Sequence, residues 1–240
     1  MNFLKKIRKS LKSSFPYELL KNYFPKVNYS FSETYGEDLF VNHFFKDLKK
    51  GFYVDIGCNL PKSGSLTYSL YKKGWNGIKV DISKRSIELN KIHRKRDINL
   101  NVSVGKDEKE VDSFIFYDNC SMNTVNKKFS KHTEKSVNKK PEINRISQKK
   151  LDTILKQNKI AKINYLNIDV EGNESEVLSG FKISKFMPEL VSIEIHDKIC
   201  PPLENKIYKY FIKHKYQLAS IYGWTYFFTL KGHNKTHFSI

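Results

Sequence analysis

Strand-like and helix-like segments alternate along the chain from Gly36 onward, and this alternation constrains the fold more than any other feature. The expected strands are residues 52–57, 77–82, 98–104, 164–170 and 190–195, and the expected helices are residues 38–50, 65–73, 84–94, 147–158, 174–179 and 203–214. Such alternation is typical of a parallel sheet with helices on both faces. Residues 216–222 and 224–230 flank Gly223 with no room for a helix, which predicts a C-terminal antiparallel hairpin. We therefore predict an α/β fold built on a mostly parallel, seven-stranded sheet.

Basic residues dominate the charge of the chain, which carries a formal net charge of +18 over 240 residues. Such a charge suggests nucleic acid or an anionic membrane as a partner. However, 38 of the 43 basic residues are lysines and only 5 are arginines, whereas proteins that read bases depend on arginine. Lys, Asn and Ile are abundant throughout the chain, so we favour a compositional bias over nucleic-acid binding.

The N-terminal segment, residues 1–33, has a basic amphipathic pattern that sets it apart from a single domain spanning residues 34–240. Apolar residues recur at helical spacing among its lysines, namely Phe3, Leu4, Ile7, Leu11 and Phe15. Two interpretations of residues 1–25 stay open. They form a helix in peripheral contact with an anionic membrane surface, or they form a helix packed on the domain or a frayed tail.

The sequence lacks the features of membrane-spanning and secreted proteins. No apolar run approaches the roughly 20 residues that a membrane span needs, and there is no signal-peptide core. The cysteines Cys58, Cys120 and Cys200 are odd in number and share no metal-ligand spacing. These observations predict a cytoplasmic protein, with peripheral membrane contact through residues 1–25 as the open alternative.

Residues 119–150 break the alternation because they are polar, basic and poor in apolar periodicity. A long stretch of this kind in a compact domain is usually a functional cover or a disordered segment. It follows one strand and precedes the strand that ends near Asp169. We therefore expect a flap or loop insertion over the site.

Two neighbouring strands end in carboxylates and a glycine. Asp55 and Gly57 end the first strand, with Asn59 just beyond, and Asp81 ends the second. Ligands of an open parallel sheet bind beyond the carboxyl ends of its strands. Asp81 is placed to accept hydrogen bonds from ribose hydroxyls, whereas the charge of Asp55 suits a cation and repels a pyrophosphate. Because the glycine patterns of NAD-binding and P-loop proteins are also absent, these residues favour S-adenosylmethionine as the cofactor.

Seven colinear stretches between residues 34 and 196 resemble the FkbM-type methyltransferases. They are YGEDLF (35–40), GFYVDIGCNLPKSGSLT (51–67), LYKKGWNGIKVDIS (70–83), RKRDINL (94–100), SMNTV (121–125), YLNIDVEGNESEVLSG (165–180) and MPELVSIEI (187–195). The family usually has Ala at the position of Cys58 and Glu-Pro at the positions of Asp81 and Ile82. Cys58 is small enough to keep the turn, and Asp81 keeps the carboxylate on a shorter arm. The resemblance implies a Rossmann-like class I methyltransferase fold.

The resemblance also implies that the acidic pair Glu37-Asp38 reaches the site, where one carboxylate would meet the ammonium group of the cofactor. An equally open interpretation places both acids at the positive end of a helix. Ser63 follows the glycine turn and stays open as a pocket residue. The predicted cofactor-binding residues are therefore Glu37, Asp55, Gly57, Asn59, Ser63, Asp81 and Asp169.

Four polar residues end the fourth and fifth strands in pairs two residues apart, Asp169 with Glu171 and Glu194 with His196. Residues at this spacing share one face of a strand, so we expect the four side chains to converge beside the acceptor. His196 is the predicted general base because its reference pKa is about 6.5, and Glu171 and Asp169 are competing candidates. Asp169, Glu171 and Glu194 could also hold Mg²⁺, but their spacing is not diagnostic and a metal is not favoured.

We predict an S-adenosylmethionine-dependent O-methyltransferase, and the family resemblance supplies the acceptor, a hydroxyl of a sugar, glycan or related small metabolite. One alternative is a nucleic-acid methyltransferase. Amino-methylating enzymes of that class carry Asn/Asp-Pro-Pro-aromatic where this chain has residues 169–172, DVEG. The other alternative is a non-catalytic basic module that docks on an anionic membrane or polyanion. The sequence does not indicate an oligomeric state.

Overall fold

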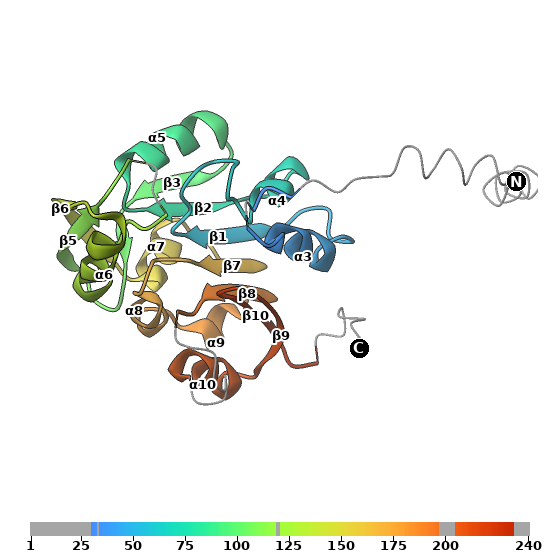
Figure 1. Cartoon of the computed structure of the whole chain (residues 1–240). Helices are drawn as coiled ribbons and strands as arrows, with labels where there is room; N and C mark the ends of the chain where they lie inside the picture. Colours follow the sequence, from blue (N-terminus) through green and yellow to red (C-terminus); the bar gives the residue numbers. More distant parts are fainter. Residues whose placement is uncertain (1–29, 33, 119–120, 197–204, 233–240) are drawn as a thin grey trace, which may run out of the picture.

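The computed structural model describes residues 30–32, 34–118, 121–196 and 205–232 (Figure 1). The helix predicted within residues 1–25 lies outside the described residues, as do the first residues of the helix predicted from Leu203. The membrane contact of the N-terminal segment therefore stays a prediction. Among the helices of the described ranges, none is both long and apolar enough to cross a bilayer.

Helices and strands alternate along the described chain, as the sequence predicts. In chain order they are α3 (Glu37–Phe44), β1 (Phe52–Ile56), α4 (Tyr68–Lys72), β2 (Asn76–Asp81), α5 (Lys84–His93), β3 (Ile98–Asn101), β4 (Ser103–Val104), β5 (Lys109–Ile115), α6 (Lys127–Val137), β6 (Glu142–Lys149), α7 (Leu151–Gln157), β7 (Tyr165–Ile168), α8 (Glu174–Ser179), α9 (Ile183–Phe186), β8 (Leu190–Glu194), α10 (Lys206–Lys213), β9 (Tyr216–Tyr222) and β10 (Thr225–Leu230).

The main sheet has seven strands within the described residues, in the order β3-β2-β1-β7-β8-β10-β9. β1 pairs in parallel with β2 and β7, β2 with β3, and β7 with β8. β10 runs antiparallel to both β8 and β9, and Gly223 lies in the turn between β9 and β10 with a φ of 55°. The structure thus confirms the predicted, mostly parallel sheet and its C-terminal hairpin.

Apolar side chains on both faces of this sheet are buried under helices, because alternate residues of a strand point to opposite faces. On one face, Val54 of β1 packs in a cluster with Leu151 of α7 and Phe211 of α10. On the other face, Tyr53 of β1 packs in a cluster with Phe40 of α3. The result is a three-layer arrangement with helices on both sides of the sheet (Figure 1), as in the Rossmann-like fold that was predicted.

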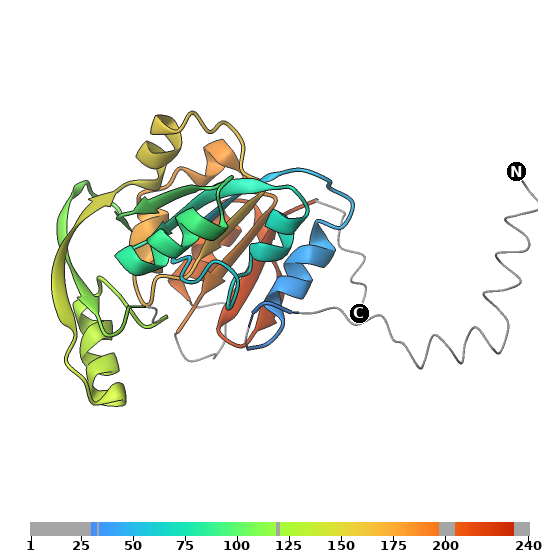
Figure 2. The ribbon, with the colours of Figure 1, turned by 90° about the horizontal axis from the view of Figure 1, so that it is seen from above.

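A second sheet of three strands, in the order β4-β6-β5 among the described residues, stands with α6 to one side of the main sheet (Figure 2). It includes part of the stretch 119–150, in which the described residues form α6 and β6. The described part of this stretch is therefore an insertion with regular structure, and its role as a flap over the site stays a prediction. The first four residues of β6 are all exposed, so no apolar alternation marks its beginning as a strand.

The helix predicted over residues 38–50 spans Glu37–Phe44, and the helix predicted over residues 65–73 spans Tyr68–Lys72. Two further boundaries differ where the chain enters the second sheet. The strand predicted over residues 98–104 is interrupted at Val102, so that β3 joins the main sheet and β4 joins the second one. The helix predicted from Ser147 begins only at Leu151, because residues before it pair with β5 as part of β6. Both differences follow from pairing with the second sheet, which the sequence pattern did not reveal.

Candidate active site

A cavity of about 400 Å³ lies where β1, β2, β7 and β8 end, within the usual range of small-molecule sites, about 300–1,000 Å³. Every residue predicted to bind the cofactor lines this cavity, namely Glu37, Asp55, Gly57, Asn59, Ser63, Asp81 and Asp169. Glu171 and Glu194 line it as well. Among the described residues of the lining, six are acidic and none is Lys, Arg or His, although the whole chain has a net charge of +18.

Gly57 occupies a position that has no room for a side chain. Its φ of 79° lies in the left-handed region that favours glycine, and a Cβ atom added there would lie 1.5 Å from the carbonyl oxygen of Asp169. The amides of Gly57 and Cys58 both donate to the carbonyl of Val80, at 2.9 and 3.1 Å. The glycine turn therefore joins the ends of β1, β2 and β7 into one surface.

Asp55 lines the cavity, but its carboxylate is held by protein groups. Thr67 Oγ1 donates to Oδ2 at 2.8 Å and Asn167 Nδ2 donates to Oδ1 at 2.9 Å. Lys79 Nζ lies 3.3 Å from Oδ2, and the two charged side chains are 0% and 3% exposed. From the sequence, the charge of Asp55 was expected to suit a cationic ligand, whereas the structure pairs that charge with Lys79.

Arg94 and Lys79 support this side of the cavity, and neither was predicted as a site residue. Arg94 is completely buried. Its guanidinium donates to the carbonyl of Pro61 at 2.7 Å, to Thr67 Oγ1 at 3.0 Å and to Asp97 Oδ2 at 3.0 Å. It thereby ties the stretch after the glycine turn to the end of α5. Lys79 could have been found from the sequence, because it lies inside the apolar run of β2 and a charged side chain in a buried strand needs a partner.

Asp81 fixes the two backbone segments that approach the cavity from β1 and β2. Its Oδ2 accepts from the amide of Asn59 at 2.8 Å, and its Oδ1 accepts from the amide of Ser83 at 2.7 Å. A carboxylate has about four acceptor positions, so further hydrogen bonds to a ligand remain available. Burial raises the pKa of Asp81, against these two amides.

The two acids at the start of α3 have different roles, and each matches one of the two interpretations that the sequence left open. Glu37 lines the cavity and accepts from Thr34 Oγ1 at 3.0 Å. Asp38 is completely buried and accepts from Ser30 Oγ and the amide of Phe31. Glu37 is therefore the member of the pair that can meet a ligand, and Asp38 holds the preceding chain.

The four polar residues that end the fourth and fifth strands converge, as predicted. His196 Nε2 lies 3.4 Å from Glu171 Oε2 and 3.0 Å from Glu194 Oε2. Asp169 is hydrogen-bonded to Glu194. The side chains of Glu171 and Glu194 are only 11% and 18% exposed. They are therefore buried groups with partners, and not solvated acids at the ends of strands. We call these four residues the acid cluster.

Burial and mutual contact set the protonation of the acid cluster. Burial raises the pKa of Asp169, and the carboxylates of Glu194 and Glu171 raise it further. Burial also raises the pKa of Glu171, against the hydrogen bond from His196. Burial opposes the ionisation of Glu194, but hydrogen bonds from His196 and Asp169 outweigh it and lower the pKa of Glu194. Hydrogen bonds to Glu171 and Glu194 raise the pKa of His196 to about 10, so His196 is protonated near neutral pH and is a poor proton acceptor.

The chain between β7 and α8 turns sharply and is fastened from both sides. Glu171 has a φ of 54°, in the left-handed region, and glycine follows at Gly172. Thr124 Oγ1 donates to the carbonyl of Glu171 at 2.8 Å, and the amide of Gly172 donates to Glu174 Oε1 at 3.1 Å. The segment before α6 therefore helps to hold Glu171 over the cavity, which the sequence analysis missed.

The family model described as Methyltransferase FkbM domain matches residues 55–218. The chain belongs to the FkbM methyltransferase family. It is an S-adenosylmethionine-dependent methyltransferase, so the alternative of a purely non-catalytic module does not hold. Comparisons with curated proteins and with solved structures give no match. The matched region of this FkbM methyltransferase covers the glycine turn, Asp81 and the acid cluster, but begins after Glu37.

The cavity of this FkbM methyltransferase fits a positively charged nucleoside. Its carboxylates suit a cation, and Leu60, Ile82 and Val102 offer apolar surface to a base. Asn59 also lines the cavity, and its buried Oδ1 lacks a hydrogen-bond partner among the described residues. A buried acceptor without a partner is costly, so a ligand that donates a hydrogen bond there would stabilise the site.

The residues that could hold a metal differ by one from the predicted set. Within the described part of the chain, Glu171, Glu194 and His196 bring ligand atoms within 4.8 Å of one another, whereas the sequence suggested Asp169 in place of His196. An imidazole must be neutral to bind a metal, so a metal held by these three residues would displace the proton that His196 carries beside the two glutamates.

Proposed function

We propose that this FkbM methyltransferase transfers a methyl group from S-adenosylmethionine to a hydroxyl of a sugar, glycan or related small metabolite. The single observation that supports it most is the charge of the cavity. Six acidic residues and no basic residue line it among the described residues. Asp55 is paired with Lys79, and Glu171 and Glu194 are paired with His196, which leaves Glu37 and Asp81 to meet a cationic ligand. An anionic cofactor or a phosphate-rich substrate would be repelled there, whereas a sulfonium nucleoside with an ammonium group is attracted.

Three parts of the cavity would hold the cofactor. Asp81 accepts the ribose hydroxyls with the acceptor positions that Asn59 and Ser83 leave free. Glu37, which lines the opposite part of the cavity near α3, pairs with the ammonium group. Gly57 lets the backbone approach the ligand without a side chain between them. When bound, S-adenosylmethionine supplies an electrophilic methyl group on its sulfonium sulfur.

The acid cluster would receive the acceptor hydroxyl and its proton. Glu171 lines the cavity, and burial raises its pKa, which makes it a stronger base than an exposed glutamate. His196 stays protonated and holds the carboxylates of Glu171 and Glu194 in place. We therefore assign proton acceptance to Glu171 Oε1 or Oε2 and orientation to His196. This arrangement reverses the order of preference that the sequence suggested.

The test is binding of S-adenosylhomocysteine by isothermal titration calorimetry, with methyl transfer from labelled S-adenosylmethionine as the second readout. Asp81→Ala should weaken binding by about 10- to 100-fold, since a hydrogen bond to a charged group contributes about 1.5–3 kcal/mol. Asp112→Asn is the matched control, because Asp112 pairs with Arg145 on the exposed second sheet and does not line the cavity. Absence of saturable binding to the folded wild-type protein would overturn the proposal.

A further inference from the structure

Two exposed aromatic side chains lie at the turn between β9 and β10, one belonging to the turn and the other packed against it. Trp224 is 48% exposed and Tyr35 is 59% exposed. The ring of Tyr35 rests on Gly223, since a Cβ atom added to that glycine would lie 2.1 Å from a carbon of the ring. Residues far apart in the sequence thus bring two exposed rings to the same turn, and we call Trp224 and Tyr35 the aromatic rim.

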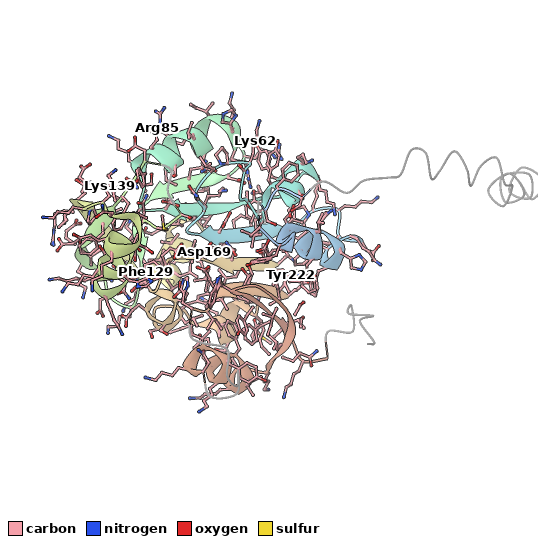
Figure 3. The ribbon with its side chains drawn as sticks, viewed as in Figure 1. Lys62, Arg85, Phe129, Lys139, Asp169 and Tyr222 are labelled. Atoms are coloured by element: carbon pink, nitrogen blue, oxygen red, sulfur yellow. The ribbon has the colours of Figure 1, made fainter. Side chains whose placement is uncertain are left out.

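The aromatic rim adjoins the acid cluster. The Trp224 ring centroid lies 6.2 Å from that of His196, whose Nε2 contacts Glu171 and Glu194. Phe129 of α6 lies on the imidazole as well, with 5.0 Å between the ring centroids. Figure 3 labels Asp169 at the end of β7, with Phe129 on one side and Tyr222, at the end of β9, on the other. Trp224 therefore lies beside the residue that contacts the two carboxylates, and its chain neighbour Thr225 lines the cavity together with Glu171 and Glu194. We call this edge of the cavity the entrance.

The fold does not need the side chain of Trp224. Its carbonyl accepts from the amide of Ile195 at 2.9 Å, a bond that any residue could make, and half of the indole is in contact with solvent. Large aromatic side chains left exposed together beside a cavity usually mark a binding surface. A hairpin turn that served only to connect two strands would accept a small polar residue here.

The chemistry of the entrance selects one class of ligand. A pyranose ring presents a face of C–H groups that packs on an aromatic ring, and its rim carries hydroxyls that donate hydrogen bonds. Trp224 and Tyr35 offer the first surface, and Glu171 and Glu194 offer acceptors for the hydroxyls. A purely apolar acceptor would leave these carboxylates desolvated without partners, which is costly. An anionic acceptor would be repelled by the negative charge of these carboxylates.

We propose that the aromatic rim is the acceptor subsite and that Trp224 stacks on the sugar ring whose hydroxyl is methylated. This inference rests on the proposed function and adds the residues that select the acceptor. The sugar ring carries no charge on the side that faces the acid cluster. Trp224 determines affinity for the acceptor and does not contact the cofactor.

The experiment uses the full chain saturated with S-adenosylhomocysteine and a panel of methyl hexopyranosides as probes. The chain has two tryptophans, and Trp75 is completely buried, so a change in the exposed tryptophan emission on titration reports on Trp224. Calorimetry then measures glycoside affinity in variants. Trp224→Ala should weaken it about tenfold, the upper range for an aromatic contact, and Trp224→Phe should restore most of it.

Two controls separate this inference from the proposed function. S-adenosylhomocysteine affinity should be unchanged in Trp224→Ala, and Ile92→Ala, which removes an exposed apolar residue on α5, should leave glycoside affinity unchanged. If S-adenosylhomocysteine binds but no glycoside changes the emission, or if Trp224→Ala binds glycosides as the wild type does, the acceptor subsite is wrong. If S-adenosylhomocysteine itself does not bind, the proposed function fails first.

Discussion

The buried ion pair of Asp55 and Lys79 provides a quantitative test of how the cofactor cavity is built. The pair joins β1 to β2 at an N–O distance of 3.3 Å, with both side chains almost fully buried. At that distance two unit charges attract by about 5 kcal/mol for an effective dielectric constant of about 20. Removing one partner leaves the other charged in the core, which costs about 3–5 kcal/mol.

The perturbation is a double-mutant cycle. Lys79→Met and Asp55→Asn should each lower the free energy of unfolding by about 3–5 kcal/mol, and the double variant should lose much less than the sum, because no unpaired charge remains. We therefore expect a coupling energy of about 3 kcal/mol or more. Urea unfolding followed by the emission of Trp75, which is completely buried, measures each corner of the cycle.

The matched control is the pair Lys106 and Glu176, which has the same N–O distance of 3.3 Å but side chains that are 52% and 43% exposed. Solvent screens such a pair, so its coupling energy should be about 0–1 kcal/mol. Additive single effects at Asp55 and Lys79, within about 0.5 kcal/mol, would refute the buried pair.

The same cycle separates two roles for Asp55 in cofactor binding. If Asp55 acts by positioning Thr67 and Asn167, the neutral double variant keeps the cavity and binds S-adenosylhomocysteine with an affinity within about tenfold of wild type, or about 1.4 kcal/mol. If its charge acts on the ligand directly, the folded double variant loses binding. We expect the first result, because Lys79 balances the charge.

Three further predictions concern the glycine turn and the acid cluster. Gly57→Ala should lower the free energy of unfolding by about 2–5 kcal/mol, because the backbone is left-handed there and the new methyl group would clash with Asp169. Gly74→Ala is the control: its φ is 96° but nothing lies within 4 Å, so it should cost only about 1–2 kcal/mol. Equal losses in urea unfolding would contradict the close contact at Gly57. His196→Gln removes the cation that favours ionised Glu171 and Glu194, so their pKa values rise and the acid limb of the pH–rate profile should move to higher pH; an unmoved limb would show that His196 does not set their ionisation. Because the carboxylates of Glu171 and Glu194 are already paired with His196, EDTA should leave the rate of methyl transfer unchanged, and a loss that Mg²⁺ restores would establish a metal site instead.

Local pattern was sufficient for the order of strands in the main sheet and for the strand-end residues of the cavity. Parallel strands bring their carboxyl ends to one edge, so Asp55, Gly57, Asp81, Asp169 and Glu194 could be placed together without any knowledge of contacts. The strand β6 was missed because its first four residues are exposed and carry no apolar alternation. The second sheet and the interruption at Val102 were missed for the same reason.

The sequence by itself determined which elements form and which side chains reach the edge of the sheet, because periodicity and strand order are local or nearly local properties. Only the tertiary structure decided the charge state of those side chains. Asp55 is neutralised by Lys79 and hydrogen-bonded to Asn167, 112 residues away in the chain, and His196 is held protonated by Glu171 and Glu194. Burial and contacts between distant segments control these properties, and neither can be read from one stretch of sequence.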